Sequence, residues 1–187
     1  YHIPGMRALQ SADAVMLFAR RRALPPEEMQ LLRDYLSRGK PLIALRTSSH
    51  AFAASGTVSA GLAQWPEFDR EVLGCTYTGH ATGGQEVRAA PAAAAHPILE
   101  GLKGPYRENE TLYRSRPLAR SCTVLLTGSF VPAPGAAAKD QVGDEPVAWT
   151  NTYGASKVFY TSLGSGTASF TKPWFRRMLV NAVFWAL

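Results

Sequence analysis

The chain has 187 residues, of which 46% are hydrophobic and 18% are charged, so it can bury a substantial core and is predicted to form one domain over residues 1–187. No apolar stretch approaches the ~20 residues of a membrane-spanning helix, which argues against a membrane partner. The net charge of +6 permits a nucleic-acid partner, but the basic residues are scattered and no aromatic-basic recognition module is present, so that partner is disfavoured.

The first part of the chain has the pattern of a strand–helix–strand unit. Residues 1–13 are expected to form a loop or short helix, and the uniformly apolar residues 14–19 a strand buried on both faces. A helix is expected from residue 24, with an apolar face made of Met29, Leu32, Tyr35 and Leu36. Gly39 ends this helix before the apolar strand 42–45, so the two strands are predicted to lie parallel.

Strand 42–45 runs directly into a polar cluster. In open α/β sheets, ligands sit beyond the carboxyl ends of such strands. The cluster offers a guanidinium, three hydroxyls and an imidazole, from Arg46, Thr47, Ser48, Ser49 and His50. The alternative is a polar turn in which Ser48 or Ser49 caps the next helix.

Strand 14–19 also ends in polar residues, the run Arg20–Arg22. These arginines either form a solvated turn or face the same crevice as Arg46, where they would attract an anionic or strongly polar ligand. The second interpretation is favoured for Arg20 and Arg22, and the first for Arg21.

The rest of the chain alternates weak and strong patterns. We expect a mobile loop at 51–61, a short helix at 67–73, strands at 85–89 and 123–130, a linker at 91–95 and a loop at 131–143. Residues 146–150 and 157–161 are predicted to pair as a hairpin, and a helix is predicted from Pro173 to the end.

Further polar residues could reach a site. His80 lies among glycines and is expected to be accessible in a loop, whereas His96 precedes a proline and is expected to be structural. Glu108, Glu110 and Tyr113 form a group that could contribute, although surface carboxylates are the commoner case.

His50 and His80 are therefore candidates for general acid–base catalysis. Arg46 and Arg20 would then polarise a carbonyl or hold a carboxylate or a hydroxyl-rich ligand. A weaker alternative is a nucleophile–base pair in which His50 activates Ser48 or Ser49, because adjacent residues on a turn rarely present that geometry.

No metal and no cofactor is predicted. The four histidines do not pair at metal-ligand spacing, and a P-loop is absent. Cys75 and Cys122 form neither a metal motif nor a disulfide framework, and each is interpreted as a small buried hydrophobe.

Several stretches resemble the ThuA-like (trehalose-utilisation) proteins of the class I glutamine amidotransferase-like superfamily. They are ADAVMLFA (12–19), LPPEEMQLLRDYLSRGKPLIALRTSSHAF (24–52), VLGCTYTGH (72–80), HPILEGL (96–102) with ENETLY (108–113), PVAWTNTYGASKVFYTSLGS (146–165) and FRRMLVNAVFWAL (175–187). The pairing of PVAW and KVFYTSLG with the closing LVNAVFWAL is the more diagnostic part. The sequence looks most similar to a branch, frequent in planctomycete-type bacteria, that carries LRT-x-x-HAF.

This resemblance implies a flavodoxin-like three-layer αβα sandwich with a mostly parallel sheet, whose usual first strand and glycine-rich loop lie before Tyr1. It also implies that His50 and His80 are the family's two histidines. Arg46 stands where glutamine amidotransferases carry a nucleophilic cysteine, so glutaminase activity is not expected. The chain departs from the family pattern at Glu110-Thr111, where the family has an aspartate-glutamate pair.

Together these observations favour an enzyme of bacterial carbohydrate metabolism. His50 and His80 would transfer protons in a hydrolase, lyase or isomerase acting on a sugar or keto-sugar derivative. Substrate binding would fall to Arg20, Arg22, Arg46, Thr47, Ser49, Glu110 and Tyr113. A non-catalytic sugar-binding or assembly module on the same scaffold is the alternative. Localisation in cytoplasm or periplasm, and assembly into a homo-oligomer, stay open.

Overall fold

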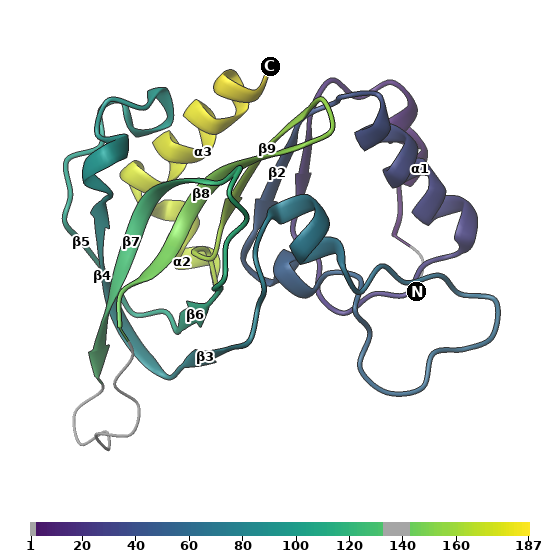
Figure 1. Ribbon diagram of the computed structural model, residues 1–187, viewed down its shortest axis with the longest axis horizontal. Helices are drawn as coiled ribbons and strands as arrows, with labels where there is room; N and C mark the ends of the chain where they lie inside the picture. Colours follow the sequence, from purple (N-terminus) through teal and green to yellow (C-terminus); the bar gives the residue numbers. More distant parts are fainter. Residues whose placement is uncertain (1–2, 133–142) are drawn as a thin grey trace.

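The computed structural model describes residues 3–132 and 143–187. A seven-stranded sheet in the order β1-β2-β9-β8-β7-β4-β5 forms its centre, as Figure 1 shows. The strands are β1 (Val15–Leu17), β2 (Leu42–Leu45), β4 (Gly83–Ala89), β5 (Tyr106–Glu108), β7 (Thr123–Pro132), β8 (Glu145–Tyr153) and β9 (Ser156–Thr161).

The parallel end of this sheet contains the predicted strand–helix–strand unit. Strand β1 pairs with β2 in parallel, Val15 opposite Leu42, and helix α1 (Pro26–Ser37) connects them. The predicted apolar face of α1 is buried, and Gly39 has the left-handed φ of +76° that a helix-ending glycine adopts. The prediction that the first strand is buried on both faces was wrong, because β1 lies at the sheet edge and Met16 is 48% exposed.

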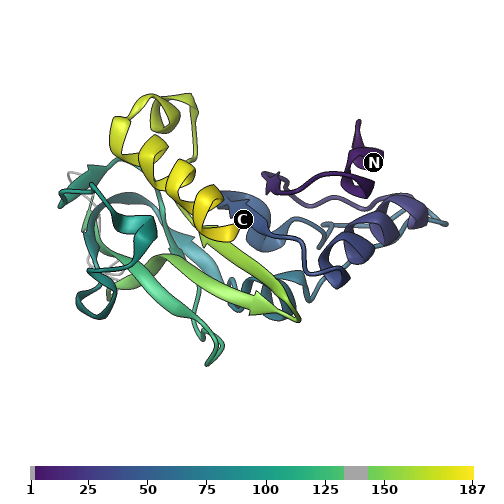
Figure 2. The ribbon, with the colours of Figure 1, turned by 90° about the horizontal axis from the view of Figure 1, so that it is seen from above.

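Alternate residues of β2 serve two separate cores. Ile43 and Leu45 pack on one face with helix α3 (Pro173–Ala186), whereas Leu42 and Ala44 pack on the other face with α1. Figure 2 shows α3 and α1 lying apart on the molecule, each beside its own part of the sheet. The predicted helix from Pro173 is confirmed, preceded by the short helix α2 (Thr167–Thr171).

The other strands are antiparallel. The predicted hairpin is confirmed, since β8 and β9 pair with Tyr153 opposite Ser156. Strands β7, β4 and β5 extend the sheet, so that within the described residues four of its six pairings are antiparallel and only β1–β2 and β2–β9 are parallel. The expectation of a mostly parallel sheet was therefore wrong, and a flavodoxin-like three-layer sandwich is not confirmed. The physical reason is that short connections such as residues 154–155 can only join antiparallel neighbours.

A second, two-stranded sheet lies beside the main one. It pairs β3 (Gly79–Ala81) with β6 (Leu112–Arg114) and places His80 opposite Tyr113. His80 is thus exposed as expected, but on a strand and not in a loop. Single-turn helices complete the fold: η1 (Met6–Gln10), η2 (Arg46–His50), η3 (Asp69–Leu73), η4 (Pro91–Ala93) and η5 (Pro97–Leu99).

Other predictions have mixed outcomes. The short helix at 67–73 and the strand at 85–89 are confirmed by η3 and β4. His96 is structural as expected, because its Nδ1 accepts a hydrogen bond from the Ile98 N–H at 3.2 Å. Most of the predicted loop 131–143 lies outside the described residues. Among the described helices, none has the length and apolar character that would be needed to cross a bilayer.

Candidate functional site

The turn that follows β2 is held in a specific shape. Arg46 has a φ of +46°, which a non-glycine residue adopts only when its surroundings hold it there. The Tyr160 hydroxyl donates to the Arg46 carbonyl at 2.6 Å, and the Thr47 hydroxyl donates to the Ala19 carbonyl at 2.9 Å. The turn is therefore anchored to β9 on one side and to the segment after β1 on the other.

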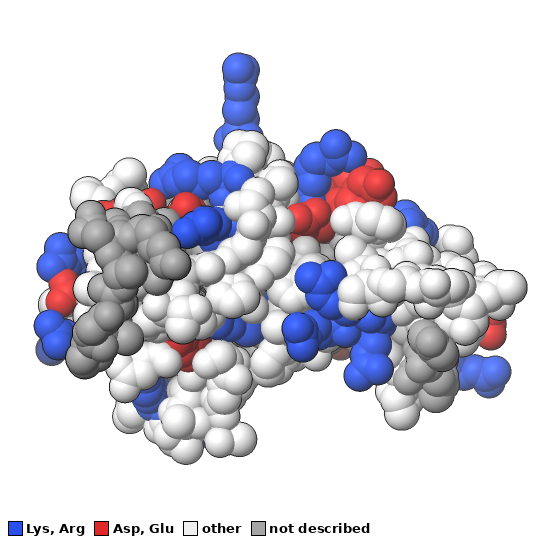
Figure 3. Space-filling view, turned by 90° about the horizontal axis from the view of Figure 1, so that it is seen from below, with Lys and Arg blue, Asp and Glu red and all other residues white. Residues whose placement is uncertain are grey.

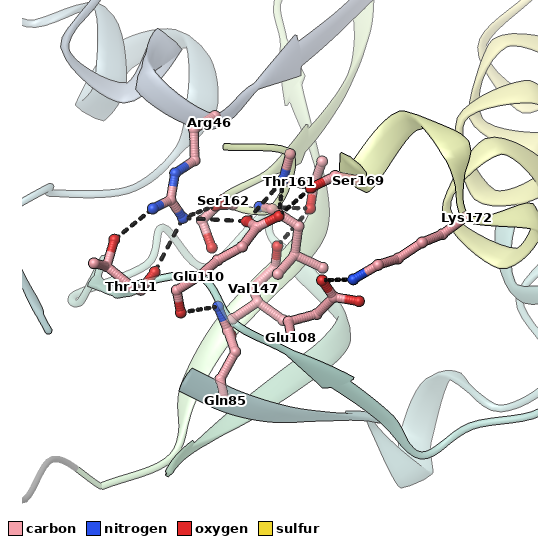
Figure 4. A network of polar contacts seen from close by, with 12 residues as sticks. Arg46, Gln85, Glu108, Glu110, Thr111, Val147, Thr161, Ser162, Ser169 and Lys172 are labelled. Carbon is pink, nitrogen blue, oxygen red and sulfur yellow. Dashed lines mark hydrogen bonds and ion pairs between the residues drawn. The ribbon is translucent and has the colours of Figure 1, made fainter. Parts of the chain in front are cut away.

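The Arg46 side chain is buried and makes three hydrogen bonds within the protein. Its guanidinium donates to the Thr111 carbonyl at 3.0 Å, to the Thr111 hydroxyl and to the Ser162 carbonyl, and it lies 3.6 Å from a Glu110 carboxylate oxygen. Figure 4 shows these contacts converging on Arg46. The guanidinium also lies 4.0 Å from the centroid of the Tyr113 ring, a cation–π geometry. These contacts tie the Arg46 side chain to Glu110, Thr111 and Ser162.

Glu110 completes this ion pair from the segment between β5 and β6. Its carboxylate accepts hydrogen bonds from the Gly164 N–H, at 2.9 Å for the shorter contact, and from the Ser169 hydroxyl. The side chain is only 5% exposed. Glu108, two residues earlier, is also buried and pairs with Lys172. Of the two alternatives that the sequence left open, the surface one does not hold, since both carboxylates are buried. Glu110 neutralises the buried Arg46, whereas Lys172, the partner of Glu108, is 34% exposed.

Four rings form an aromatic cluster beside Arg46, which we define as His50, Tyr77, His80 and Tyr113. His50 stacks on Tyr77 with ring centroids 4.6 Å apart and an interplanar angle of 27°. Tyr113 lies 4.8 Å from Tyr77 and 5.9 Å from His80. The Tyr77 hydroxyl is 3.0 Å from His80 Nδ1, within hydrogen-bond distance. The two histidines are thereby joined through Tyr77.

The cluster is assembled from distant parts of the chain. Tyr77 follows η3, which is fixed to the sheet because Trp149 Nε1 donates to the Leu73 carbonyl at 2.7 Å and Asn151 Nδ2 donates to the Val72 carbonyl at 3.0 Å. His80 and Tyr113 are opposite each other in the β3–β6 ladder. The second sheet therefore brings His80 towards the turn after β2 that carries His50.

Burial and charge change the acid–base properties of the cluster. Burial, followed by the positive charges of Arg21, Arg20 and Arg46 and by His80, lowers the pKa of His50 to about 4. His50 is therefore neutral at pH 7, with Nδ1 3.1 Å from the Ser49 hydroxyl. Burial raises the pKa of Tyr77 and of Tyr113, so both phenols keep their protons.

Two cavities and a buried network complete the description of the site. A cavity of about 380 Å³ opens at the carboxyl ends of β1 and β2, and Arg20, Arg22 and Thr47 are among its lining residues. A second, apolar cavity of about 300 Å³ lies beneath η1, lined by residues such as Leu9 and Val15.

A further buried hydrogen bond reaches the segment that carries Glu110. Gln85 Nε2 donates to the Glu110 carbonyl at 3.4 Å, as Figure 4 shows.

The structure brings the residues singled out in the sequence into one region. His50, His80, Tyr113 and Arg46 share contacts, with Glu110 bound to Arg46 and Ser49 bound to His50. Arg20, Arg22 and Thr47 line the adjacent cavity. Their roles in catalysis or binding stay predictions. Among the described residues, no group of three or more His, Cys, Asp or Glu side chains is placed to hold a metal ion.

Sequence reasoning missed Tyr77 and the groups that hold Glu110. Tyr77 was visible as the aromatic residue three positions before His80 in the stretch VLGCTYTGH. The contribution of Ser169 and of the Gly164 N–H had no local signal, because it depends on the segment after β9 reaching Glu110 across more than 50 residues of sequence.

The mixed sheet, with a polar turn at the carboxyl ends of its parallel strands, defines an α/β protein with a candidate small-molecule site. A family model described as ThuA, trehalose utilisation, matches residues 5–186. The chain therefore belongs to the ThuA family. Comparison of the sequence with curated proteins found no match.

Solved structures support the fold. A ThuA-like protein from Bacteroides uniformis has a TM-score of 0.68 at 18% identity, with 97% of this chain and 71% of that chain covered. A ThuA-like protein from Parabacteroides merdae has a TM-score of 0.70 at 19% identity, with 95% and 71% covered. A cold-adapted β-galactosidase from Rahnella sp. R3 has a TM-score of 0.58 at 15% identity, with 94% of this chain but only 23% of the enzyme covered.

Proposed function

We propose that this protein is an enzyme of bacterial carbohydrate metabolism that acts on a sugar or keto-sugar derivative by proton transfer at the aromatic cluster. The observation that carries the proposal is the convergence of His50, Tyr77 and His80 beside the carboxyl ends of parallel strands. Membership of a family described by trehalose utilisation supports a sugar as substrate, and so does the presence of a similar fold within a β-galactosidase.

The two histidines suit different parts of a proton transfer. His50 is uncharged at neutral pH, because its pKa is lowered to about 4, and an uncharged imidazole can accept a proton from a substrate hydroxyl or from carbon next to a carbonyl. His80 is exposed and joined to Tyr77, so a proton can be returned from the other side of the stack. Such chemistry fits a hydrolase, a lyase or an isomerase.

Arg46 supports this site without contacting the substrate in our proposal. Its donors are directed at Thr111 and Ser162, and its charge is balanced by Glu110. It occupies the turn where, by the resemblance noted in the sequence, glutamine amidotransferases carry a cysteine nucleophile. A guanidinium cannot serve as that nucleophile, which is why we propose sugar chemistry and not glutamine hydrolysis.

A non-catalytic sugar-binding or assembly module is the second candidate. It is favoured by the burial of His50, which is only 8% exposed and so has a limited surface for a substrate. In this case the ring stack would serve as an apolar platform for a sugar, and no bond would be broken.

The test combines product detection with stability measurements. The purified protein is incubated with a panel of aldoses, ketoses and oxidised disaccharides, and products are followed by NMR. His50→Gln and His80→Gln are expected to lower turnover by about 10²–10⁴-fold, the usual contribution of a general acid or base. His96→Gln is the matched control, because His96 caps η5 and packs near Trp185, away from the cluster.

The outcomes separate the candidates. Loss of turnover in the His50 and His80 variants, with melting temperatures close to that of the His96 control, would support the enzyme. A sugar that raises the melting temperature without forming product on prolonged incubation would instead support the binding module. Turnover that survives both substitutions would contradict the assignment of these histidines.

A further inference from the structure

The three arginines after β1 are held in place by the turn that carries His50. The Ala19 N–H donates to the Ser48 hydroxyl at 3.4 Å, and the Arg21 N–H donates to the His50 carbonyl at 2.9 Å. Arg21 has a φ of +51°, so the backbone reverses at this point, and the Arg22 N–H then bonds to the Ala51 carbonyl. The backbone of this segment therefore follows η2 closely, while the three arginines themselves are exposed.

The charges of these arginines are not balanced within the described part of the chain. Arg46 is paired with Glu110, but none of the ion pairs in the described ranges involves Arg20, Arg21 or Arg22. The face shown in Figure 3 carries a group of Lys and Arg side chains near its middle. The positive charges of Arg21 and Arg20 act on the aromatic cluster, because after burial they are the next causes that lower the pKa of His50. Positive potential without a counter-charge attracts anions.

This positive region coincides with a cavity of suitable size. The cavity of about 380 Å³ is lined by Arg20 and Arg22 together with Ile3, Pro4, Phe18, Ala19 and Thr47. Its volume falls in the range of small-molecule sites, which combine apolar walls with a few polar groups. Arg20 and Arg22 are both exposed and both line this cavity, and guanidinium groups suit the oxygens of a carboxylate or a phosphate.

We propose that this cavity binds the anionic end of the substrate, and that the substrate is a sugar derivative carrying a carboxylate or a phosphate. The assignment to a sugar depends on the proposed function, whereas the requirement for an anion comes from Arg20 and Arg22. The hydrogen bond from the Arg21 N–H to the His50 carbonyl holds the arginine segment against the turn that carries His50, so the cavity and His50 share one stretch of backbone. A neutral sugar would leave both guanidinium groups without a partner.

The test is isothermal titration calorimetry at low salt with four probes: glucose 6-phosphate, glucuronate, glucose and inorganic phosphate. The wild-type protein is expected to bind at least one anionic sugar about tenfold or more tightly than glucose, since charge-assisted hydrogen bonds are the stronger ones. Arg20→Gln/Arg22→Gln should remove this preference. Arg120→Gln/Arg176→Gln is the matched control, because it removes two exposed arginines elsewhere.

Each outcome has a distinct meaning. Preference for glucose 6-phosphate indicates a phosphate, and preference for glucuronate a carboxylate. Equal affinity for glucose and both anionic sugars would overturn this inference but leave the proposed function intact. An equal loss of preference in both double variants would also overturn it, since net charge and not the cavity would be responsible. Binding of none of the sugars, with or without binding of inorganic phosphate, would overturn both proposals.

Discussion

Replacement of Glu110 by alanine should destabilise the protein by about 3–5 kcal/mol, because removal of one partner leaves a buried charge uncompensated. The side chains of Arg46 and Glu110 are 6% and 5% exposed, so solvent cannot replace the lost carboxylate. The same substitution removes the acceptor for the Gly164 N–H and for the Ser169 hydroxyl. For a chain of this length, the loss corresponds to a fall in Tm of about 6–20 °C.

The assay is urea unfolding at pH 7, with Glu86→Ala as the control. Glu86 pairs with Arg88, whose side chain is 63% exposed, so its loss should change the free energy of unfolding by less than about 1 kcal/mol. Arg46→Met combined with Glu110→Leu should recover the part of the loss that comes from the uncompensated charge, because both charges are then removed together. It should not recover the part that comes from the Gly164 N–H and the Ser169 hydroxyl, which still lack their acceptor. The reasoning would be refuted if the Glu110→Ala variant lost no more stability than Glu86→Ala.

Three further predictions follow from single features of the structure. In the folded protein the pKa of His50 is lowered to about 4, so as pH falls from about 6.5 the unfolded chain binds a proton before the folded one does. The free energy of unfolding should therefore drop by up to about 3 kcal/mol between pH 7 and pH 4. Urea unfolding over this pH range measures the drop, and the His50→Gln variant should show a smaller one. Gly74→Ala should lower Tm by several degrees, because the φ of Gly74 is +73° and an added Cβ would lie 2.6 Å from Cys122 Sγ. Gly143→Ala is the control, which should not change Tm because open space surrounds that position. Lys172→Met leaves Glu108 buried without its cation, which raises the pKa of Glu108 further. The loss in free energy of unfolding should therefore be larger at pH 8, where the carboxylate is charged, than at pH 5. An equal loss at both pH values would contradict this.

Elements that depend on local pattern could be predicted from the sequence. Helix α1 and helix α3 have apolar faces at helical spacing, and the β8–β9 hairpin has two β-rich runs around Tyr153-Gly154. The turn after β2 was also visible, because an apolar run ended abruptly in polar residues.

Elements that depend on distant pairing could not be predicted. The position of β1 at the sheet edge does not follow from its apolar residues, because burial is decided by which strand lies next to it. The antiparallel pairings of β4 with β7 and β5 join segments with no local signal for strand order. The same holds for Glu108 and Glu110, whose burial depends on Lys172 and Arg46 from other parts of the fold.

Two sets of arginines near His50 differ in how their charge is balanced. Arg46 is neutralised by Glu110 and is buried against the Tyr113 ring. Arg20 and Arg22 lie at the surface, where hydration offsets their charge until a ligand replaces the water. In our proposal the buried arginine supports the ring stack, while the exposed pair supplies the positive charge that binds the ligand. A substrate that bound only to the rings would make no use of that charge, which is why the anionic end of the ligand is the feature that the calorimetric comparison should find first.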